Sequence, residues 1–492
     1  MMIDDDSLQE GDVSGLDATK RRQLELDEDA GTESMTVAIP GRGLTKVAIN
    51  TTKIQEKAQA ARAVYEHAVA LGASFGPYIK PCFDAFLPLV DFKYSSEIRA
   101  TAAQTLAAVF DSACNHDDST GMEIPKAYLP LLTQAISKQI QEEDTGDMDT
   151  VYALADSLCG VCRSMYLYVA DHGKALLGNH SQGDVKFVVQ CCMKSVVLCL
   201  ERRSHITGVL ANGPLSGEDE RNELDALLQR EEDLLTPLVD SVGYSLKCFG
   251  PMFVPIFEED VAPVLGSYLG AGNDIRARLS AVCLFDDCVE HCGSAAAARF
   301  GPPLVQGILN GMNDAMQDSE LKRGAIYGIA QIARHAPATV LAEHAQYLSQ
   351  QLCLITNCPK GESENAVIYE NAVSALASLV LFDNAPFRNA GFVKRETLVQ
   401  SFLNSLPLRE DEDEAKLCHA GLCDLIEAGS IDANYDNLGR IVMETLACVE
   451  DGEEIASLQT CDRLRSILIR LQQQNANVFL QAPFGFANVV SP

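Results

Sequence analysis

Apolar residues recur along most of the chain at spacings of three and four, which is the period of an amphipathic helix. The first clear example begins after residue 51, where Ile54, Ala58, Ala61 and Tyr65 share one helical face. Strand signals are nearly absent by comparison. The pattern therefore predicts an all-α fold.

Short strings return at fixed intervals, which indicates an internal repeat. They are FLPLV at 86–90 and YLPLL at 128–132; FGP at 75–77, 249–251 and 300–302; and SEIR at 96–99, NDIR at 273–276 and SELK at 319–322. Gly-Pro separates two helices, because Pro fits the first helical turn. Ser or Asn before an acid is expected to cap the next helix. Intervals of about 40–47 residues are typical of HEAT and armadillo units, so we expect a HEAT-repeat α-solenoid.

The predicted solenoid covers residues 51–475, as about eight helix pairs and a capping helix. The pairs are expected at 51–92, 95–143, 148–203, 218–270, 274–317, 319–357, 364–406 and 410–450, and the capping helix near 454–475. Residues 204–232 look like an enlarged insertion. Each repeat should contact only its neighbours, so no sharp domain boundary is expected inside the array.

The two ends of the chain lack the helical spacing of apolar residues. Residues 1–34 carry eleven acids and three bases, so residues 1–50 are predicted to be an acidic, largely disordered segment. Within it, residues 35–50 either pair briefly or stay irregular. Residues 476–492 are assigned to a C-terminal tail.

Charge narrows the classes of partner. The 492 residues include 69 acids and 38 bases, a net charge of −31. This field repels nucleic acids and anionic membranes and attracts basic proteins. No apolar run is long enough to span a membrane, and the start MMIDDD is too acidic for a signal peptide. The 17 Cys lie mostly in apolar stretches, which is typical of reduced thiols in the cytosol or nucleus.

Four strings in the second half of the chain resemble one family in their order and spacing. They are FDDCVEHC at 285–292, KRGAIYGIA at 322–330, ENAVSA at 370–375, and LPLRED at 406–411 followed by LCDLIE at 422–427. Together they resemble the C-terminal half of the importin-β-like karyopherins, and most closely the importin beta-three (importin five) branch. The resemblance covers roughly residues 50–475.

This resemblance implies a superhelical HEAT array that carries cargo through nuclear pores and releases it on binding Ran-GTP. The implied partners are basic cargo proteins with nuclear localisation signals, Ran-GTP and Phe-Gly nucleoporins, and the implied location is the cytoplasm and nucleus. Family members are about twice this length, and their N-terminal, Ran-binding arch has no counterpart here. We therefore expect the C-terminal arch of such a receptor. The alternative is a generic HEAT scaffold that assembles a protein complex.

Acids on apolar helices are the candidate partner-binding residues. Asp286, Asp287 and Glu290 either act as general acid and base, or bind Lys and Arg of a cargo, or form salt bridges to arginines of neighbouring repeats such as Arg276. Glu370 and Asn371 form a second candidate pair of partner-binding residues. The Asn side chain either binds the backbone of an extended peptide or makes a capping or inter-repeat hydrogen bond.

Enzyme chemistry has little support in the sequence. There is no Gly-rich phosphate loop, Gly-x-Ser-x-Gly elbow or His-Glu-x-x-His motif. Cys159 and Cys162 form a Cys-x-x-Cys pair within an apolar helical pattern and are expected in the core. Cys288, His291 and Cys292 share a helix but lack a fourth zinc ligand. We predict a protein that is not an enzyme and has no catalytic residue, cofactor or metal.

Overall fold

The structure is a computed structural model that describes residues 8–12, 32–39, 43–116, 123–144, 146–213, 217–314, 318–361, 364–431 and 437–474. The predicted tail at 476–492 lies outside the described residues. The chain divides into two compact units, Met1–Val261 and Ala262–Pro492, and each is described by itself.

The first unit opens with a small antiparallel sheet in the order β1-β3-β2. Its strands are β1 (Leu8–Asp12), β2 (Thr32–Ile39) and β3 (Gly43–Asn50). Residues 8–12 and 32–34 therefore depart from the predicted disorder, whereas pairing at residues 35–50 was one of the two alternatives that the sequence left open. Met35, Val37 and Ile39 alternate with other residues, which is the period of a strand. The high acid content of residues 1–34 led to the prediction of disorder for β1 and for the start of β2.

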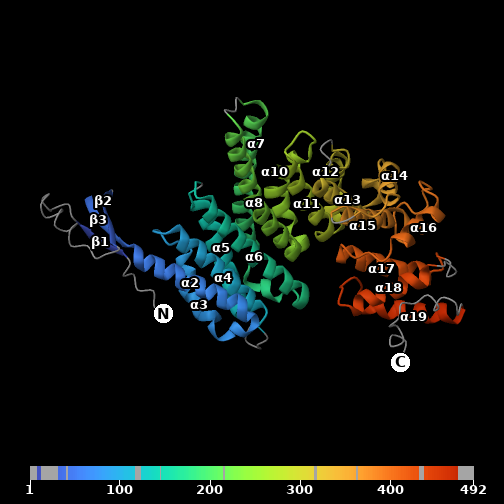
Figure 1. Cartoon of the computed structure of the whole chain (residues 1–492), viewed down its shortest axis with the longest axis horizontal. Coiled ribbons are helices and arrows are strands. Elements are labelled where there is room, and N and C mark those ends of the chain that lie inside the picture. Colours follow the sequence, from blue (N-terminus) through green and yellow to red (C-terminus); the bar gives the residue numbers. More distant parts are fainter. Residues whose placement is uncertain are drawn as a thin grey trace. The chain divides into compact units, whose positions relative to one another are not determined.

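The helices of the first unit form two layers (Figure 1). Layer I contains helices that pack side by side in sequence order, and layer II contains their partners. Layer I consists of α2 (Thr51–Leu71), α4 (Ser96–Cys114), α6 (Met148–His172) and α8 (Glu218–Phe249); layer II consists of α3 (Ile79–Phe86), α5 (Glu123–Glu142), α7 (Gln182–Asn212) and the short α9 (Val254–Ile256).

The second unit repeats this arrangement. It begins with the short α10 (Ala262–Leu265). Layer I then consists of α11 (Ile275–His291), α13 (Ser319–His335), α15 (Glu364–Leu376) with the π-helical turn η8 (Ala377–Leu381), α17 (Glu412–Glu427) and α19 (Leu458–Gln474); layer II consists of α12 (Ser294–Met312), α14 (Ala345–Thr356), α16 (Arg395–Ser405) and α18 (Leu438–Glu450).

Hydrogen bonds between neighbouring repeats confirm the repeat length. Thr105 Oγ1 of α4 donates to Ala61 O of α2, and Ser112 Oγ of the same helix donates to Ala68 O, both across 44 residues. Arg334 of α13 and Ser378 of η8 are also 44 residues apart. The helix pairs thus lie where the sequence predicts them. The all-α, HEAT-type fold class is confirmed for the part of the chain that follows the sheet.

The helix caps differ from the prediction by one residue. Ser95 Oγ, Asp274 Oδ1 and Asp318 Oδ1 accept backbone N–H groups at 3.2, 3.0 and 2.9 Å and cap α4, α11 and α13. The predicted caps were the neighbouring Ser and Asn residues. An Asp at the N-cap also places a negative charge at the positive end of the helix dipole.

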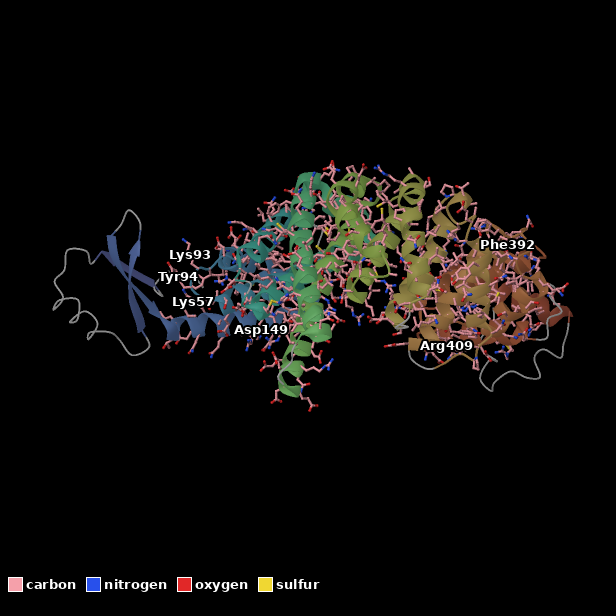
Figure 2. All side chains as sticks on the ribbon, turned by 90° about the horizontal axis from the view of Figure 1, so that it is seen from above. Lys57, Lys93, Tyr94, Asp149, Phe392 and Arg409 are labelled. Atoms are coloured by element: carbon pink, nitrogen blue, oxygen red, sulfur yellow. The ribbon has the colours of Figure 1, made fainter. Side chains whose placement is uncertain are left out.

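The predicted insertion at 204–232 is a continuation of α7 and α8, apart from residues 214–216, which lie outside the described residues. The two helices extend beyond their neighbours in the first unit (Figures 1 and 2). Arg202 Nη2 donates to Glu231 Oε2 at 2.7 Å and ties the two helices together. Within the described ranges, no helix combines the length and apolar character that crossing a membrane requires.

Candidate partner-binding surfaces

Asp286 of α11 points into the protein, not toward a partner. Its side chain is 2% exposed, and its Oδ1 atom has no hydrogen-bond partner among the described residues. Burial, together with the nearby Asp287 and Glu290, raises the pKa of Asp286 well above its usual range. Gly328 of α13 lies against this carboxyl group, since a Cβ at that position would collide with Oδ1. The acid is part of the contact between α11 and α13.

The other two acids of α11 are half-buried. Glu290 Oε2 accepts a hydrogen bond from Tyr327 Oη of α13 at 2.7 Å. Burial and the charge of Glu290 raise the pKa of that phenol. Arg276, the expected partner of this acidic group, instead forms its ion pair with Glu320 of α13. Asp287 and Glu290 remain the accessible members of the predicted set.

Glu370 of α15 is fully buried and holds a loop in place. Its carboxylate accepts the backbone N–H groups of Arg409, Glu410 and Asp411, with the shortest at 2.8 Å, and pairs with Lys360 Nζ at 2.5 Å. The Arg409 side chain lies at the surface (Figure 2), whereas its backbone faces the carboxylate. The Glu370 carboxylate thus faces the chain itself, and a partner-binding role for it stays a prediction.

Asn371 follows Glu370 in the chain and is 3% exposed. Its Oδ1 atom has no hydrogen-bond partner among the described residues. That atom therefore makes no hydrogen bond to a neighbouring repeat, and peptide binding by Asn371 stays a prediction. Because α13 lies between α11 and α15 in layer I, the two predicted groups of residues do not form one site.

A buried ion cluster in the second unit was missed from the sequence. Arg334 of α13 donates to both oxygens of Glu414 of α17 at 2.9 and 2.6 Å, and to Ser374 and Ser378 between them at 2.7 and 3.0 Å. Burial opposes the charge, but Glu414 keeps the pKa of Arg334 above its ordinary value. We call these four residues the Arg334 cluster; it joins three consecutive layer I helices.

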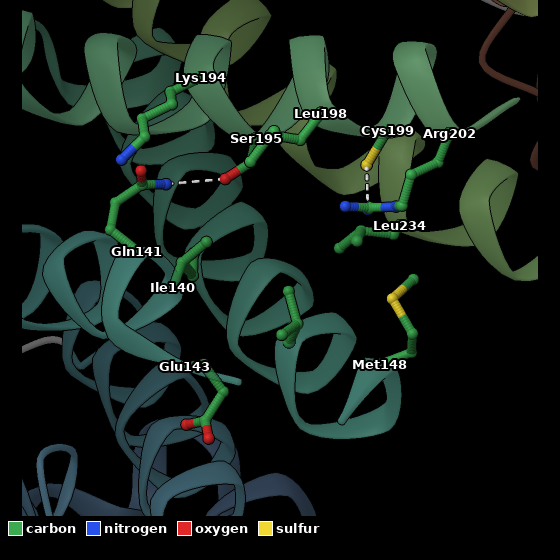
Figure 3. Close-up of a pocket in the computed structure, with 11 residues that line it drawn as sticks. Ile140, Gln141, Glu143, Met148, Lys194, Ser195, Leu198, Cys199, Arg202 and Leu234 are labelled. Carbon is green, nitrogen blue, oxygen red and sulfur yellow. Dashed lines mark hydrogen bonds between the residues drawn. The ribbon is translucent and has the colours of Figure 1, made fainter. Parts of the chain in front are cut away.

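A small cavity lies between α5, α6, α7 and α8 (Figure 3). Its volume is about 60 Å³, which suits a few water molecules rather than a substrate. Gln141 Nε2 donates to Ser195 Oγ at 2.7 Å across it. Lys194 lies at the edge, and Arg202 contacts Cys199 Sγ at 3.4 Å.

A larger apolar groove of about 610 Å³ lies between α3 and α5, in layer II of the first unit. The ring of Phe83 stacks on Tyr128 with centroids 4.3 Å apart, and Leu131 is 48% exposed beside them. Tyr128 Oη donates to Asp84 Oδ1 at 2.6 Å and marks the polar edge. The sequence contained this signal in the FLPLV and YLPLL strings, but as a repeat marker only.

Most thiols are buried in the core, whereas Cys159 is partly buried and Cys358 is exposed. Cys159 and Cys162 belong to α6, and burial raises the pKa of Cys162 to about 12. Cys288 and Cys292 are buried and hydrogen-bonded to each other, which raises the pKa of Cys288. Among the residues that the structure describes, no three His, Cys, Asp or Glu side chains gather closely enough to hold a metal ion.

The sequence of the chain is similar to that of one known transport receptor. No protein-family model matches the chain. The chain is 21% identical over 418 residues to importin subunit beta-3 of Saccharomyces cerevisiae, which covers 82% of this chain and 35% of that protein. The chain therefore spans about a third of the length of the curated relative.

Solved structures of the karyopherin Kap121p have the same fold. With Kap121p bound to the SUMO protease Ulp1p the TM-score is 0.68, at 17% identity over 96% of this chain and 39% of that one. With Kap121p bound to RanGTP it is 0.66, at 16% identity over 94% and 39%. With Kap121p bound to Nup53p it is 0.64, at 16% identity over 96% and 40%. The expected resemblance and the HEAT-repeat fold are confirmed.

Proposed function

We propose that this chain, a homologue of importin subunit beta-3 over most of its length, is the C-terminal arch of a nuclear import receptor of the karyopherin-β type. The observation that carries the proposal is the joint match of sequence and fold to this one group of proteins. Kap121p has been solved bound to the SUMO protease Ulp1p, to Nup53p and to RanGTP, and we propose cargo proteins, Phe-Gly nucleoporins and Ran-GTP as the corresponding partners here. The receptor would shuttle between cytoplasm and nucleus.

The mechanism would be binding without chemistry. The net charge of −31 favours basic cargo with nuclear localisation signals and speeds its association at low salt. The cavity in Figure 3 is too small for a substrate, and Asp286, whose pKa burial raises well above its usual range, does not line it. We propose no enzymatic activity, no cofactor, no direct nucleic-acid contact and no membrane insertion.

The groove between α3 and α5 is the surface that we assign to Phe-Gly nucleoporins. It is apolar and shallow, and it offers an aromatic stack and an exposed aliphatic side chain to a Phe ring. Leu131→Ser should weaken the binding of a Phe-Gly repeat peptide by about tenfold, since it removes apolar contact worth 1–2 kcal/mol. Leu167→Ser is the matched control, because Leu167 of α6 is similarly exposed at 45%.

The two leading functions differ in their response to nucleotide. The resemblance places the main Ran contact in the N-terminal arch, so the chain should be tested joined to the N-terminal arch of its relative. This fusion should be immobilised, loaded with a basic nuclear-localisation peptide and exposed to Ran in its GTP or GDP form. A receptor arch should lose the peptide only with Ran-GTP, because release requires a coupling free energy between the two sites. Equal retention with both forms would instead favour the HEAT scaffold.

A further inference from the structure

A groove of about 520 Å³ lies in the second unit, between the end of α14, α15 and one face of α16. Every residue that lines it has a side chain able to make a hydrogen bond. We call it the amide groove, and its walls include Asn357, Glu396, Thr397, Gln400, Ser401 and Asn404. The groove between α3 and α5, in contrast, is lined mostly by aromatic and aliphatic side chains. The two grooves therefore suit ligands of different chemistry.

The amide side chains of α16 are held in a defined orientation. Gln400 Nε2 donates to Asn404 Oδ1 at 2.8 Å, and Asn437 Nδ2 donates to the same oxygen at 3.4 Å. These bonds use the acceptor atom of Asn404 and a donor of Gln400. Gln400 Oε1 and Asn404 Nδ2 have no partner among the described residues. The helix thus offers an acceptor and a donor to a ligand in the groove.

The polar groups of α16 recur at an interval that matches an extended peptide. Glu396, Gln400 and Asn404 are four residues apart, so each lies about 6 Å further along the helix than the one before. In an extended peptide, the N–H and C=O groups on one side recur every second residue, at intervals of about 6.6–6.8 Å. Three helix positions over ~12 Å therefore match three peptide positions over ~13 Å, which corresponds to a strand of about five residues.

The lining favours an uncharged occupant. Glu396 is the one charged residue that lines the groove, although the net charge of the chain is −31. Tyr369 Oη is already hydrogen-bonded to Ser405 Oγ at 2.7 Å. No large apolar side chain is exposed along the lining, unlike Leu131 beside the groove between α3 and α5, so a Phe ring gains little contact here. A peptide backbone, in contrast, supplies both the donor and the acceptor that the amides require.

We propose that the amide groove binds an extended, uncharged polar segment of a partner protein through the backbone of that segment. Gln400 Oε1 accepts a backbone N–H group, Asn404 Nδ2 donates to a backbone C=O group, and Asn357 contacts the segment from the opposite wall. Main-chain hydrogen bonds of this kind give affinity with little demand on sequence. The site therefore adds a docking point for Ser-, Thr- or Asn-rich segments, and it requires neither cargo nor Ran.

A nine-residue peptide of alternating Ser and Ala, acetylated and amidated at its ends, tests this binding to the full chain. NMR of the chain labelled with ¹³C at its Thr methyl groups reports on the groove, because Thr356 and Thr397 line it. Their signals, assigned by Thr→Ser changes, should shift and reach half-saturation below about 5 mM peptide. Gln400→Ala and Asn404→Ala should each raise the Kd by about fivefold, since each removes one neutral hydrogen bond.

Gln306→Ala is the matched control and should leave the Kd unchanged. Gln306 Nε2 of α12 donates to Asn310 Oδ1 in the same i, i+4 arrangement, but neither residue lines the amide groove. Thermal melting checks that all variants are folded. The same peptide methylated at every backbone nitrogen should cause no shift, because it has no N–H group to donate.

Binding that weakens with both groove variants and with backbone methylation supports the proposal. No shift up to about 5 mM peptide overturns it, as do equal shifts with the methylated peptide or a Kd that neither groove variant changes. A Phe-Gly repeat peptide that binds the amide groove more tightly than the Ser-Ala peptide also overturns it. None of these outcomes bears on nucleotide-dependent release, which tests the proposed transport function separately.

Discussion

The substitution Glu370→Gln tests whether the buried Glu370 carboxylate stabilises the fold. In the folded chain the Glu370 carboxylate accepts hydrogen bonds from three consecutive backbone N–H groups, those of residues 409–411, and from the Lys360 ammonium group. Glutamine has the same shape but replaces one acceptor oxygen by an NH₂ group. That group would face donors and leave about two of the hydrogen bonds unmade in a fully buried place.

The expected cost follows from these contacts. A hydrogen bond to a charged group contributes about 1.5–3 kcal/mol, so losing two should lower the free energy of unfolding by about 4 kcal/mol. Since about 2–4 °C in Tm corresponds to each kcal/mol in a unit of this size, Tm of the second unit should fall by ~8–16 °C. Hydrogen exchange should accelerate at the amides of residues 409–411 first.

Glu364→Gln is the matched control, since Glu364 is exposed on the same helix, and its effect should stay within about 0.5 kcal/mol. Differential scanning calorimetry and hydrogen exchange with mass spectrometry measure both variants. The reasoning is refuted if Glu370→Gln leaves Tm and exchange unchanged while it weakens the binding of a basic peptide. That result would restore the partner-binding role predicted from the sequence.

Three further predictions follow from buried groups. Burial lowers the pKa of His180 to about 4 from a usual 6.5, so folding favours its neutral form. The contribution of this group to the free energy of unfolding is therefore fully present above pH 6.5 and falls by ~2 kcal/mol at pH 5. Urea titrations at several pH values should show that His180→Gln lacks this part of the loss. Gly328→Ala should destabilise by about 1–3 kcal/mol in chemical denaturation, because its Cβ would collide with a carboxyl oxygen of α11, whereas Gly324→Ala, whose nearest contact is 3.5 Å, should be neutral or stabilising. Arg334→Met should lower the free energy of unfolding by about 3–5 kcal/mol, and the additional change Glu414→Gln should restore part of that loss. A double-mutant cycle measures this coupling, and additive losses would contradict a direct ion pair.

The helix pairs could be predicted because their signals are local. The three-and-four spacing of apolar residues and the Gly-Pro breaks both act within one or two turns of chain. Strand β2 carried an equally local signal in the alternation of residues 35–39, and brief pairing at residues 35–50 was one of the two alternatives. For residues 8–12 and 32–34 the acid-rich composition outweighed the pattern, and composition says little about pairing between backbones.

The roles of the candidate acids could not be predicted, because each depends on a distant partner. Glu370 binds backbone N–H groups about 40 residues away, and a backbone donor leaves no mark in the sequence. Asp286 is buried because layer I helices have neighbours on both sides as well as in layer II. An acid on an apolar helix therefore looks accessible in the sequence although the array covers it. Arg334 and its acid are 80 residues apart, beyond any repeat interval.

The Arg334 cluster has a mechanical consequence. A stack of repeats held only by nearest neighbours twists a little at every interface, and each interface yields independently. A bond from α13 to α17 spans two interfaces at once, so α13, α15 and α17 must turn as a single block or break a buried ion pair. Torsion applied to the second unit should therefore collect in the helices outside this block, which makes the three bridged helices a stiff segment in an otherwise elastic array.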